Sequence, residues 1–319
     1  AHAGQSRKGD ERVPYFTHLE SVVAILREHG YDDETVLAGA WLHDLLEDQP
    51  AHAELLRAEF PADVVVLVER LSETKHDASG TARAKSVRFQ GYLANIALDD
   101  EASRMARAVS CADKIDNTRS LLASERGPHK LLAELRTRPG QHAHHAASLR
   151  ALYTADVAPS LLGAFDVATG ELSEYIARWL PGHAVAVAAE AHRGAYDKAG
   201  APYVLHPLRL MMRARDDAER MAALLHDVVE DAGWTLERLS DEGFPPAVVR
   251  AVDRLTKREG ESYEAFIDRV LTDPLATRVK LLDIEDNLDL TRLEVLDAKA
   301  LERVQKYHTA RARLLAALG

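Results

Sequence analysis

Apolar positions recur three or four residues apart along most of the chain, which is the spacing of an amphipathic helix. The pattern is clearest over residues 35–46 and 219–229. Ala, Leu, Arg and Glu fill long segments, whereas alternating runs of β-branched residues are few. The pattern therefore predicts an all-α fold in which these two segments are central, buried helices. Asp32 and Asp33 can supply an N-cap for the first of them.

The two predicted central helices carry the same motif, and further landmarks repeat around it. The repeated pairs are His43-Asp44-x-x-Glu47-Asp48 with His226-Asp227-x-x-Glu230-Asp231, Ala1-His2-x-Gly4-x-x-x-Lys8 with Ala191-His192-x-Gly194-x-x-x-Lys198, Pro14-Tyr15-x-x-His18 with Pro202-Tyr203-x-x-His206, and Asp113-x-x-Asp116-Asn117 with Asp283-x-x-Asp286-Asn287. The first copy has a two-residue insertion between Lys8 and His18. This common order predicts duplication of one domain.

The length of the chain agrees with two domains. Its 319 residues exceed the usual single-domain range of roughly 100–200 residues, and each half can bury its own core. We expect the boundary near Pro181-Gly182, which gives tandem helical bundles over residues 1–181 and 182–319.

The repeated motif suits a divalent-metal site. An adjacent His-Asp pair on a helix can bind one ion, together with a second His from upstream and an Asp from downstream. The predicted ligands are His18, His43, Asp44 and Asp113 in the first copy, and His206, His226, Asp227 and Asp283 in the second. Imidazole and carboxylate groups suit Mn²⁺, Fe²⁺ or Zn²⁺, so the residues leave the identity of the metal open.

Two carboxylates lie one helical turn beyond each His-Asp pair. Residues four apart share a helix face, so Glu47 and Asp48 in the first copy, and Glu230 and Asp231 in the second, can orient a water molecule and accept its proton. A divalent ion lowers the pKa of water and screens charge on phosphate oxygens. These residues predict metal-dependent hydrolysis of a phosphate ester or anhydride.

Other histidines give weaker signals. A single motif of this kind could be an exposed acidic helix turn, but two copies with matching His and Asp residues argue against that explanation. By contrast, His142, His144 and His145 cluster in a polar stretch, where we expect a solvated loop or helix face.

The composition of the chain limits the classes of partner that it can be expected to bind. A formal charge of -11 disfavours broad binding to nucleic acid but is compatible with a small anionic ligand. Cys111 is the single cysteine, so an intrachain disulfide is excluded. With no run of about 18 apolar residues and no N-terminal leader pattern, we expect a cytoplasmic protein with no membrane partner. The sequence leaves the oligomeric state open, and a homo-oligomer is compatible with it.

The first copy resembles the HD-superfamily hydrolase domain of RelA/SpoT homologues over most of residues 1–125. The resemblance rests on Gln5-x-Arg7-Lys8, Tyr15-x-x-His18, His43-Asp44-x-x-Glu47-Asp48 and Ala112-Asp113-Lys114-Ile115-x-Asn117-x-Arg119-Ser120-Leu121. It implies an all-helical fold, bound Mn²⁺, and removal of the 3′-pyrophosphate from guanosine tetra- or pentaphosphate.

Substrate contacts follow from the resemblance alone. It implies that Asn117 and Ser120 contact the nucleotide and that Arg7 stacks on or flanks the base, with Lys8 beside it. Asp116 stands where the family commonly has His or another residue. The resemblance also implies that His18, His43, Asp44 and Asp113 bind the metal, while Glu47 and Asp48 handle the water.

The second copy keeps the metal motif but departs at the recognition positions. Lys198 and Asn287 are its substrate-binding candidates. Asp197 replaces the base-contacting Arg, and Leu288-Asp289-Leu290 replaces Thr118-Arg119-Ser120. An Asp there loses a cation–π contact and repels phosphate, so we expect guanosine alarmone binding mainly in the first copy. Residues 182–319 resemble a generic HD phosphohydrolase.

Two other functions stay open. A diiron HD oxygenase would need further His ligands for a second iron. A nucleotide-sensing protein, in which one repeat is regulatory, is the other alternative, although both copies retain the carboxylates of the motif.

Overall fold

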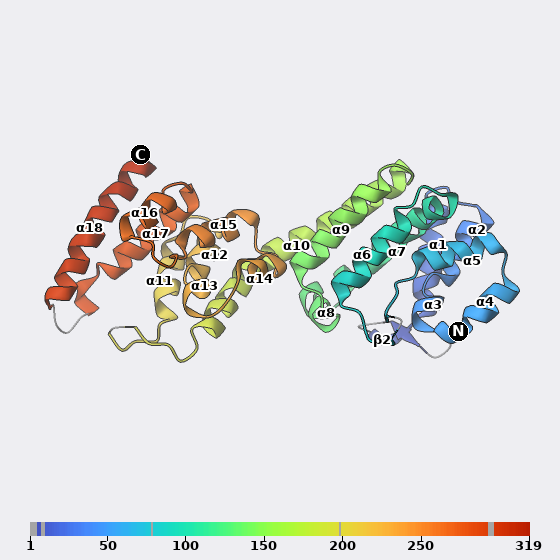
Figure 1. Cartoon of the computed structure of the whole chain (residues 1–319), viewed down its shortest axis with the longest axis horizontal. Helices are drawn as coiled ribbons and strands as arrows, with labels where there is room; N and C mark the ends of the chain where they lie inside the picture. Colours follow the sequence, from blue (N-terminus) through green and yellow to red (C-terminus); the bar gives the residue numbers. More distant parts are fainter. Residues whose placement is uncertain (1–4, 8–9, 78, 198, 293–296) are drawn as a thin grey trace. The chain divides into compact units, whose positions relative to one another are not determined.

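The computed structural model describes residues 5–7, 10–77, 79–197, 199–292 and 297–319. Over these residues the fold is α-helical apart from one two-stranded sheet and isolated bridges, which confirms the predicted all-α class. The chain forms two compact units (Figure 1). Unit 1 comprises residues 1–137 and 142–174, and unit 2 comprises residues 138–141 and 175–319.

Unit 1 holds a small sheet and the first helices of the chain. Its elements are β1 (Ser6–Arg7), β2 (Asp10–Pro14), α1 (Phe16–Glu28), α2 (Glu34–Leu42), α3 (Leu45–Asp48), the 3₁₀ helix η1 (Pro50–His52), α4 (Ala53–Glu59), α5 (Ala62–Leu71), α6 (Lys85–Ile96), α7 (Glu101–Ala123), α8 (Pro128–Glu134), most of α9 (Pro139–Tyr153) and the first part of α10 (Pro159–Ala191). The β1 and β2 strands pair antiparallel.

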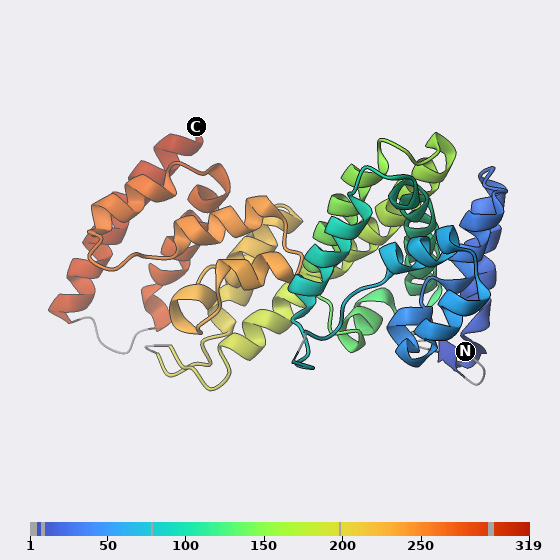
Figure 2. The same ribbon diagram turned by 45° about the vertical axis from the view of Figure 1, so that its right-hand side comes forward.

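The centre of unit 1 is formed by α1, α2, α5 and α7, which pack against one another (Figure 2). Leu26, Leu67 and Ile115 are among the fully buried side chains in this core. A Cβ atom at Gly39 would clash with the Leu67 side chain, so glycine allows α2 and α5 to approach closely. As predicted, Asp33 caps α2, because its Oδ1 accepts from Thr35 N at 2.9 Å.

Unit 2 repeats the central packing of unit 1. Its elements are the end of α10, α11 (Leu205–Arg213), α12 (Asp217–Leu225), α13 (Val228–Asp231), α14 (Leu236–Asp241), α15 (Pro246–Leu255), α16 (Tyr263–Val270), α17 (Pro274–Asn287), the 3₁₀ helix η2 (Leu290–Arg292) and α18 (Ala298–Leu318). Here α11, α12, α15 and α17 pack together, as α1, α2, α5 and α7 do.

The division between the units lies inside a helix. Unit 1 ends at Glu174 and unit 2 resumes at Tyr175, both within α10. Pro181, which suggested a boundary in the sequence, is an interior residue of the same helix. The expected domain boundary at residues 181–182 therefore falls a few residues after the change from one unit to the other.

The prediction of a single helix over residues 35–46 is wrong in one respect, because the helix breaks at His43 and Asp44. Helix α2 ends at Leu42 and α3 begins at Leu45. The His43 ring hydrogen-bonds through Nδ1 to the Ala40 carbonyl at 2.8 Å, at the end of α2. The helix predicted over 219–229 breaks in the same way at His226 and Asp227.

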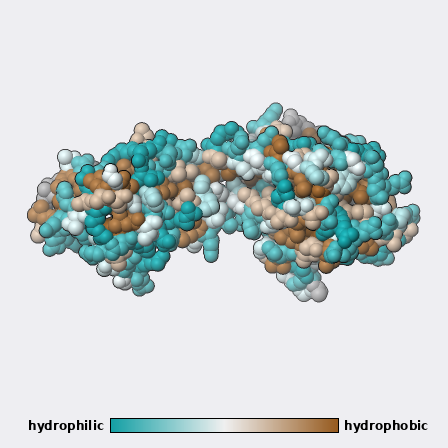
Figure 3. Space-filling view, turned by 90° about the horizontal axis from the view of Figure 1, so that it is seen from above, coloured by the Kyte–Doolittle hydropathy of each residue, from teal (hydrophilic) through white to brown (hydrophobic). Residues whose placement is uncertain are grey.

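On the face of each unit that Figure 3 shows, hydrophilic residues predominate and apolar groups lie between them. Among the described helices, none combines the length and the apolar character needed to cross a bilayer.

Candidate metal centres

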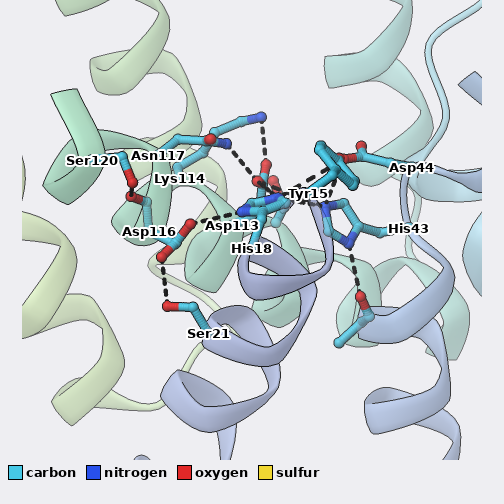
Figure 4. A network of polar contacts seen from close by, with 12 residues as sticks. Tyr15, His18, Ser21, His43, Asp44, Asp113, Lys114, Asp116, Asn117 and Ser120 are labelled. Carbon is cyan, nitrogen blue, oxygen red and sulfur yellow. Dashed lines mark hydrogen bonds and ion pairs between the residues drawn. The ribbon is translucent and has the colours of Figure 1, made fainter. Parts of the chain in front are cut away.

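Three buried side chains from three helices converge in unit 1 (Figure 4). His18 comes from α1, His43 follows α2 and Asp113 comes from α7, and their candidate ligand atoms all lie within 4.8 Å of one another. His18 Nε2 is 3.2 Å from His43 Nε2 and 3.2 Å from Asp113 Oδ1. Two imidazole nitrogens and a carboxylate oxygen that face one point are a suitable donor set for a divalent ion.

Asp44 lies at the edge of this cluster. Its Oδ2 is 3.3 Å from His43 Nε2 and 3.8 Å from His18 Nε2. The Tyr15 hydroxyl donates a hydrogen bond to the same oxygen. The structure therefore brings together all four residues that the sequence predicts as ligands in the first copy.

A second layer of contacts orients the two imidazole rings. His18 Nδ1 is 2.7 Å from Asp116 Oδ2, and Ser21 Oγ donates to the other oxygen of Asp116 at 2.5 Å. His43 Nδ1 is held by the Ala40 carbonyl. When Nδ1 of each ring carries the proton, Nε2 of each ring presents its lone pair to the cluster. The sequence reasoning assigned Asp116 no such role, although its spacing of three from Asp113 places both on one face of α7.

The charges in the cluster favour a bound cation. Burial opposes ionisation of Asp113, but Lys114 and the neighbouring histidines hold the pKa of its carboxyl well below the usual value. Burial likewise disfavours a charged imidazole, yet Asp113 and Asp116 raise the pKa of His18 to about 9. Burial and the Asp113 charge raise the pKa of Asp44. A divalent cation at this point would take the place of the additional proton on His18 and favour the ionised form of Asp44.

The predicted catalytic carboxylates of unit 1 are held in different ways. Glu47 Oε1 accepts a hydrogen bond from the Glu73 backbone N at 2.7 Å, and burial raises the pKa of the Glu47 carboxyl. Lys75 Nζ donates to the Glu47 carbonyl at 2.9 Å and lies 3.3 Å from Asp48 Oδ1. Lys75 Nζ also lies 3.6 Å from Glu47 Oε2, and Glu47, unlike Asp48, borders a cavity of about 410 Å³ in unit 1.

The predicted substrate contacts are only partly described. Asn117 Nδ2 donates to Asp113 Oδ1 at 2.5 Å, and Ser120 Oγ donates to the Asp116 carbonyl at 2.9 Å. Asn117 and Ser120 both border the cavity. Arg7 lies in β1, but its side chain is outside the described part of the structure. Residues 1–4, Lys8 and Lys198 also lie outside the described residues.

The cluster forms one wall of a cavity of about 410 Å³ in unit 1. Besides the metal-binding candidates, its polar lining includes Lys114, Asn117 and Ser120, and its apolar lining includes Phe89, Leu131, Leu132, Leu135 and Leu149. A cavity with a charged wall and an apolar remainder suits a ligand that is itself part anionic and part apolar.

Two histidines that we expected to be solvated line this cavity. His142 and His145 lie on α9, three residues apart, and both are half-buried. His145 stacks on Phe89 with ring centroids 3.7 Å apart. Burial lowers the pKa of His142 to about 4. Only His144 is exposed as expected. Their helical spacing was the available signal, but polar neighbours obscured it.

Unit 2 contains a second cluster of the same construction. His206 from α11, His226 after α12 and Asp283 from α17 are buried, with candidate ligand atoms within 4.8 Å of one another. His206 Nε2 is 3.2 Å from Asp283 Oδ1. Asp227 Oδ2 is 2.9 Å from His226 Nε2 and accepts a hydrogen bond from Tyr203.

The rings of the second cluster are oriented as in the first. His206 Nδ1 is 2.7 Å from Asp286 Oδ2, and His226 Nδ1 is 2.8 Å from the Ala223 carbonyl. Arg209 holds Asp286 where Ser21 holds Asp116, since Arg209 Nε is 2.7 Å from Asp286 Oδ1. His226 Nε2 is buried and makes no hydrogen bond of acceptable geometry, although Asp227 Oδ2 lies 2.9 Å away. A metal ion would satisfy this nitrogen.

Glu230 and Asn287 make the same kinds of contact as their counterparts in unit 1. Glu230 Oε2 accepts from the Lys257 backbone N at 3.0 Å, as Glu47 does from Glu73. Asn287 Nδ2 donates to Asp283 Oδ1 at 2.6 Å. Burial and the Asp227 charge raise the pKa of Asp231.

Comparisons with known proteins concern the first part of the chain. Residues 1–137 match the model of an HD domain family. A GTP pyrophosphokinase of Streptomyces coelicolor is 35% identical over 144 residues, which are 40% of this chain and 17% of that protein. The guanosine-3′,5′-bis(diphosphate) 3′-pyrophosphohydrolase MESH1 of Drosophila melanogaster is 35% identical over 121 residues, which are 38% of this chain and 63% of that protein.

Among solved structures, that of a metazoan orthologue of SpoT that hydrolyses ppGpp is 26% identical, with a TM-score of 0.37. It covers 43% of this chain and 84% of the other chain. The chain spans less than two thirds of the length of the two curated relatives described above.

Proposed function

We propose that this chain, whose residues 1–137 are an HD domain with homology to SpoT and MESH1 hydrolases, is a metal-dependent nucleotide hydrolase. Its best-supported substrate is guanosine tetra- or pentaphosphate or a related nucleotide, from which it would remove the 3′-pyrophosphate. The observation that carries this proposal is the convergence of His18, His43, Asp44 and Asp113 on one wall of the 410 Å³ cavity of unit 1.

Each unit is proposed to hold one divalent ion. His18, His43, Asp44 and Asp113 would bind it in unit 1, and His206, His226, Asp227 and Asp283 would bind it in unit 2. The buried Nε2 of His226, which faces the Asp227 carboxylate and makes no hydrogen bond, supports the second site. Mn²⁺ is our first choice, and Fe²⁺ or Zn²⁺ also suit these nitrogen and oxygen donors. A bound ion would lower the pKa of water and screen charge on the phosphate oxygens.

Glu47 is the proposed proton acceptor in unit 1. Its Oε1 is engaged by the Glu73 backbone N, and its Oε2, which lies 3.6 Å from Lys75 Nζ, is the oxygen that we propose for the attacking water. Because burial raises its pKa, this carboxylate is a better base than an exposed one. Asp48 is proposed to orient the water, and its pairing with Lys75 connects it to the Glu47 carbonyl.

The cavity supports a nucleotide as the ligand. Lys114, Asn117 and Ser120 lie on its polar side and can contact phosphate or ribose oxygens. Phe89, stacked on His145, belongs to the apolar lining, where a base could pack. Arg7 remains the proposed base contact from β1. With a substrate of this kind, we propose that the protein acts in the cytoplasm.

Unit 2 is proposed to act on, or bind, a different phosphorylated ligand. Asp197 stands at the position of Arg7, and its Oδ1 accepts from the backbone N of Ala199 and Ala201, both at 2.9 Å. It therefore places a negative charge at the position where the first copy has the cation Arg7. Lys198 and Asn287 remain its substrate-binding candidates.

A nucleotide panel tests the proposal. The full chain would be incubated with Mn²⁺ and guanosine tetraphosphate, its adenosine analogue, ordinary nucleotides or NADPH, and the products would be separated by chromatography. We expect pyrophosphate and the corresponding 5′-diphosphate from guanosine tetraphosphate. Turnover of another nucleotide but not of guanosine tetraphosphate would show that the proposed substrate is wrong. No turnover of any nucleotide in the panel would contradict the proposed activity.

A further inference from the structure

The two oxygens of Asp113 have different partners. Asp113 Oδ1 faces the cluster, 3.2 Å from His18 Nε2, and accepts from Asn117 Nδ2 at 2.5 Å. Asp113 Oδ2 points the other way and lies 2.7 Å from Lys114 Nζ (Figure 4). One oxygen is therefore available to an ion, while an ammonium group holds the other.

Asp283 in unit 2 has the same division of contacts. Its Oδ1 lies 3.2 Å from His206 Nε2 and accepts from Asn287 Nδ2 at 2.6 Å. Its Oδ2 lies 2.7 Å from Lys280 Nζ. Yet Lys114 follows its aspartate by one residue, whereas Lys280 precedes its aspartate by three. The same contact is made from two different positions on the helix.

Helix geometry permits this exchange, because the two positions are four residues apart and thus lie on one face. In unit 1 the position corresponding to Lys280 is Ser110, whose Oγ hydrogen-bonds to the hydroxyls of Tyr92 and Tyr153. In unit 2 the position corresponding to Lys114 is Ile284, which is fully buried.

Each lysine also packs beside an aromatic ring from the preceding helix. Lys114 Nζ is 5.6 Å from the centre of the Tyr92 ring on α6, and Lys280 Nζ is 4.9 Å from that of Phe266 on α16. Phe266 has no hydroxyl, so it needs no hydrogen-bonding partner where Tyr92 has Ser110. The exchange of lysine positions is thus matched by the neighbouring residues.

We propose that Lys114 and Lys280 are positioning residues that hold Oδ2 of the metal-binding aspartate, so that only Oδ1 binds the ion. A carboxylate can bind a divalent ion through one oxygen or two. Restricting it to one leaves a coordination position for water or substrate. This inference rests on the proposed metal centres, but on no particular nucleotide.

If Lys114 has this positioning role, its removal should change the Mn²⁺ affinity in the opposite direction from the loss of a merely structural contact. Without the ammonium group, Asp113 can turn both oxygens to the ion, and a positive charge near that ion is removed. Mn²⁺ binding should therefore stay as tight or become tighter, by up to roughly tenfold. The number of water molecules on Mn²⁺ should fall. Loss of a merely structural contact would weaken Mn²⁺ binding instead.

The test titrates Mn²⁺ alone into the full chain. A background with His226→Ala and Asp227→Ala confines binding to unit 1. Lys114→Met is compared with Lys130→Met, which removes the charge of an exposed lysine on α8. Calorimetry gives the affinity, and the relaxation of solvent protons reports the water ligands of Mn²⁺. Circular dichroism checks that each variant is folded.

A relocated lysine provides the matched rescue. The variant Tyr92→Phe/Ser110→Lys/Lys114→Ile places the lysine in unit 1 where unit 2 has it. It should restore the affinity and water count of the background protein, while Lys114→Arg should restore them in part. If the triple variant does not fold, the direction in which Lys114→Met changes the Mn²⁺ affinity still distinguishes a positioning role from a merely structural one.

Weaker Mn²⁺ binding by folded Lys114→Met, or an unchanged water count, would overturn the proposal. These readouts need no turnover, so they stay separate from the question of substrate. A protein that passes them but hydrolyses no nucleotide would contradict only the proposed function.

Discussion

Nδ1 of His18 lies 2.7 Å from Oδ2 of Asp116. The same distance joins Nδ1 of His206 to Oδ2 of Asp286 in the second unit. A carboxylate on the far nitrogen fixes the orientation of an imidazole and makes its other nitrogen a better metal ligand. Asp116 and Asp286 thus belong to the candidate centres although neither is a predicted ligand.

Substitution of Asp116 should therefore weaken metal binding without removing a ligand. We expect Asp116→Ala to lower the Mn²⁺ affinity of unit 1 by about 10–100-fold, the usual effect of losing such a partner. Calorimetric titration in the His226→Ala/Asp227→Ala background measures it. The control is Asp156→Ala, which removes another carboxylate of unit 1, the partner of Arg107. Equal affinities for Asp116→Ala and the control would refute the orienting role.

The two centres should lose their ions independently, because their ligand sets share no residue. We predict that Asp44→Ala removes one ion and leaves that of unit 2, whereas Asp227→Ala does the reverse. Elemental analysis after saturation with Mn²⁺ and removal of excess metal gives the stoichiometry, and anomalous scattering gives the location. A wild-type protein with metal in unit 1 alone would defeat the two-centre proposal.

Glu47→Gln should keep the metal and lose most turnover, since it preserves the size of the side chain while removing the basic carboxylate. The expected loss is about 10²–10⁴-fold in kcat. Residual activity could arise in unit 2, so the double variant Glu47→Gln/Glu230→Gln is the necessary comparison. Turnover by that double variant at the wild-type rate would show that the proposed proton role is wrong.

Protonation of His142 should destabilise unit 1 in mild acid. Burial, with smaller effects of His145 and Lys114, lowers its pKa in the folded protein from 6.5 to about 4. Between these pH values the unfolded chain binds a proton that the folded chain does not, so stability falls as the pH falls. The loss approaches roughly 3 kcal/mol near pH 4.

Urea denaturation at several pH values would measure this effect. His142→Gln should flatten the pH dependence between pH 6.5 and 4, and His144→Gln, at an exposed position of the same helix, should not. Parallel pH profiles for the wild-type protein and His142→Gln would rule out the buried, neutral imidazole.

The helical class and the grouping of predicted ligands could be obtained from the sequence, because helical periodicity and an internal repeat are local signals. Each copy supplied the expected His and Asp positions for the other. The break at His43, where the imidazole ring contacts the Ala40 carbonyl, could not be obtained in this way. Periodicity does not report such a contact.

Contacts between segments that are distant in the chain could not be predicted from the sequence either. Spacing puts Asp116 on the same face of α7 as Asp113, but its role depends on α1, which brings His18 and Ser21 against α7. The polar neighbours of His142 and His145 suggested solvent, but α9 places both side chains in the lining of the cavity. A repeat predicts that equivalent residues occupy equivalent positions. It cannot predict that Lys114 and Lys280 contact equivalent oxygens from different positions on their helices.

Hydrolysis of guanosine tetraphosphate by Asp44→Ala and Asp227→Ala, measured side by side with Mn²⁺, shows which unit acts on the alarmone. We predict that Asp44→Ala abolishes release of pyrophosphate, while Asp227→Ala retains it near the wild-type rate. Loss of this activity in Asp227→Ala with full activity in Asp44→Ala would contradict the assignment to unit 1, because unit 2 would then be the site that acts on the alarmone.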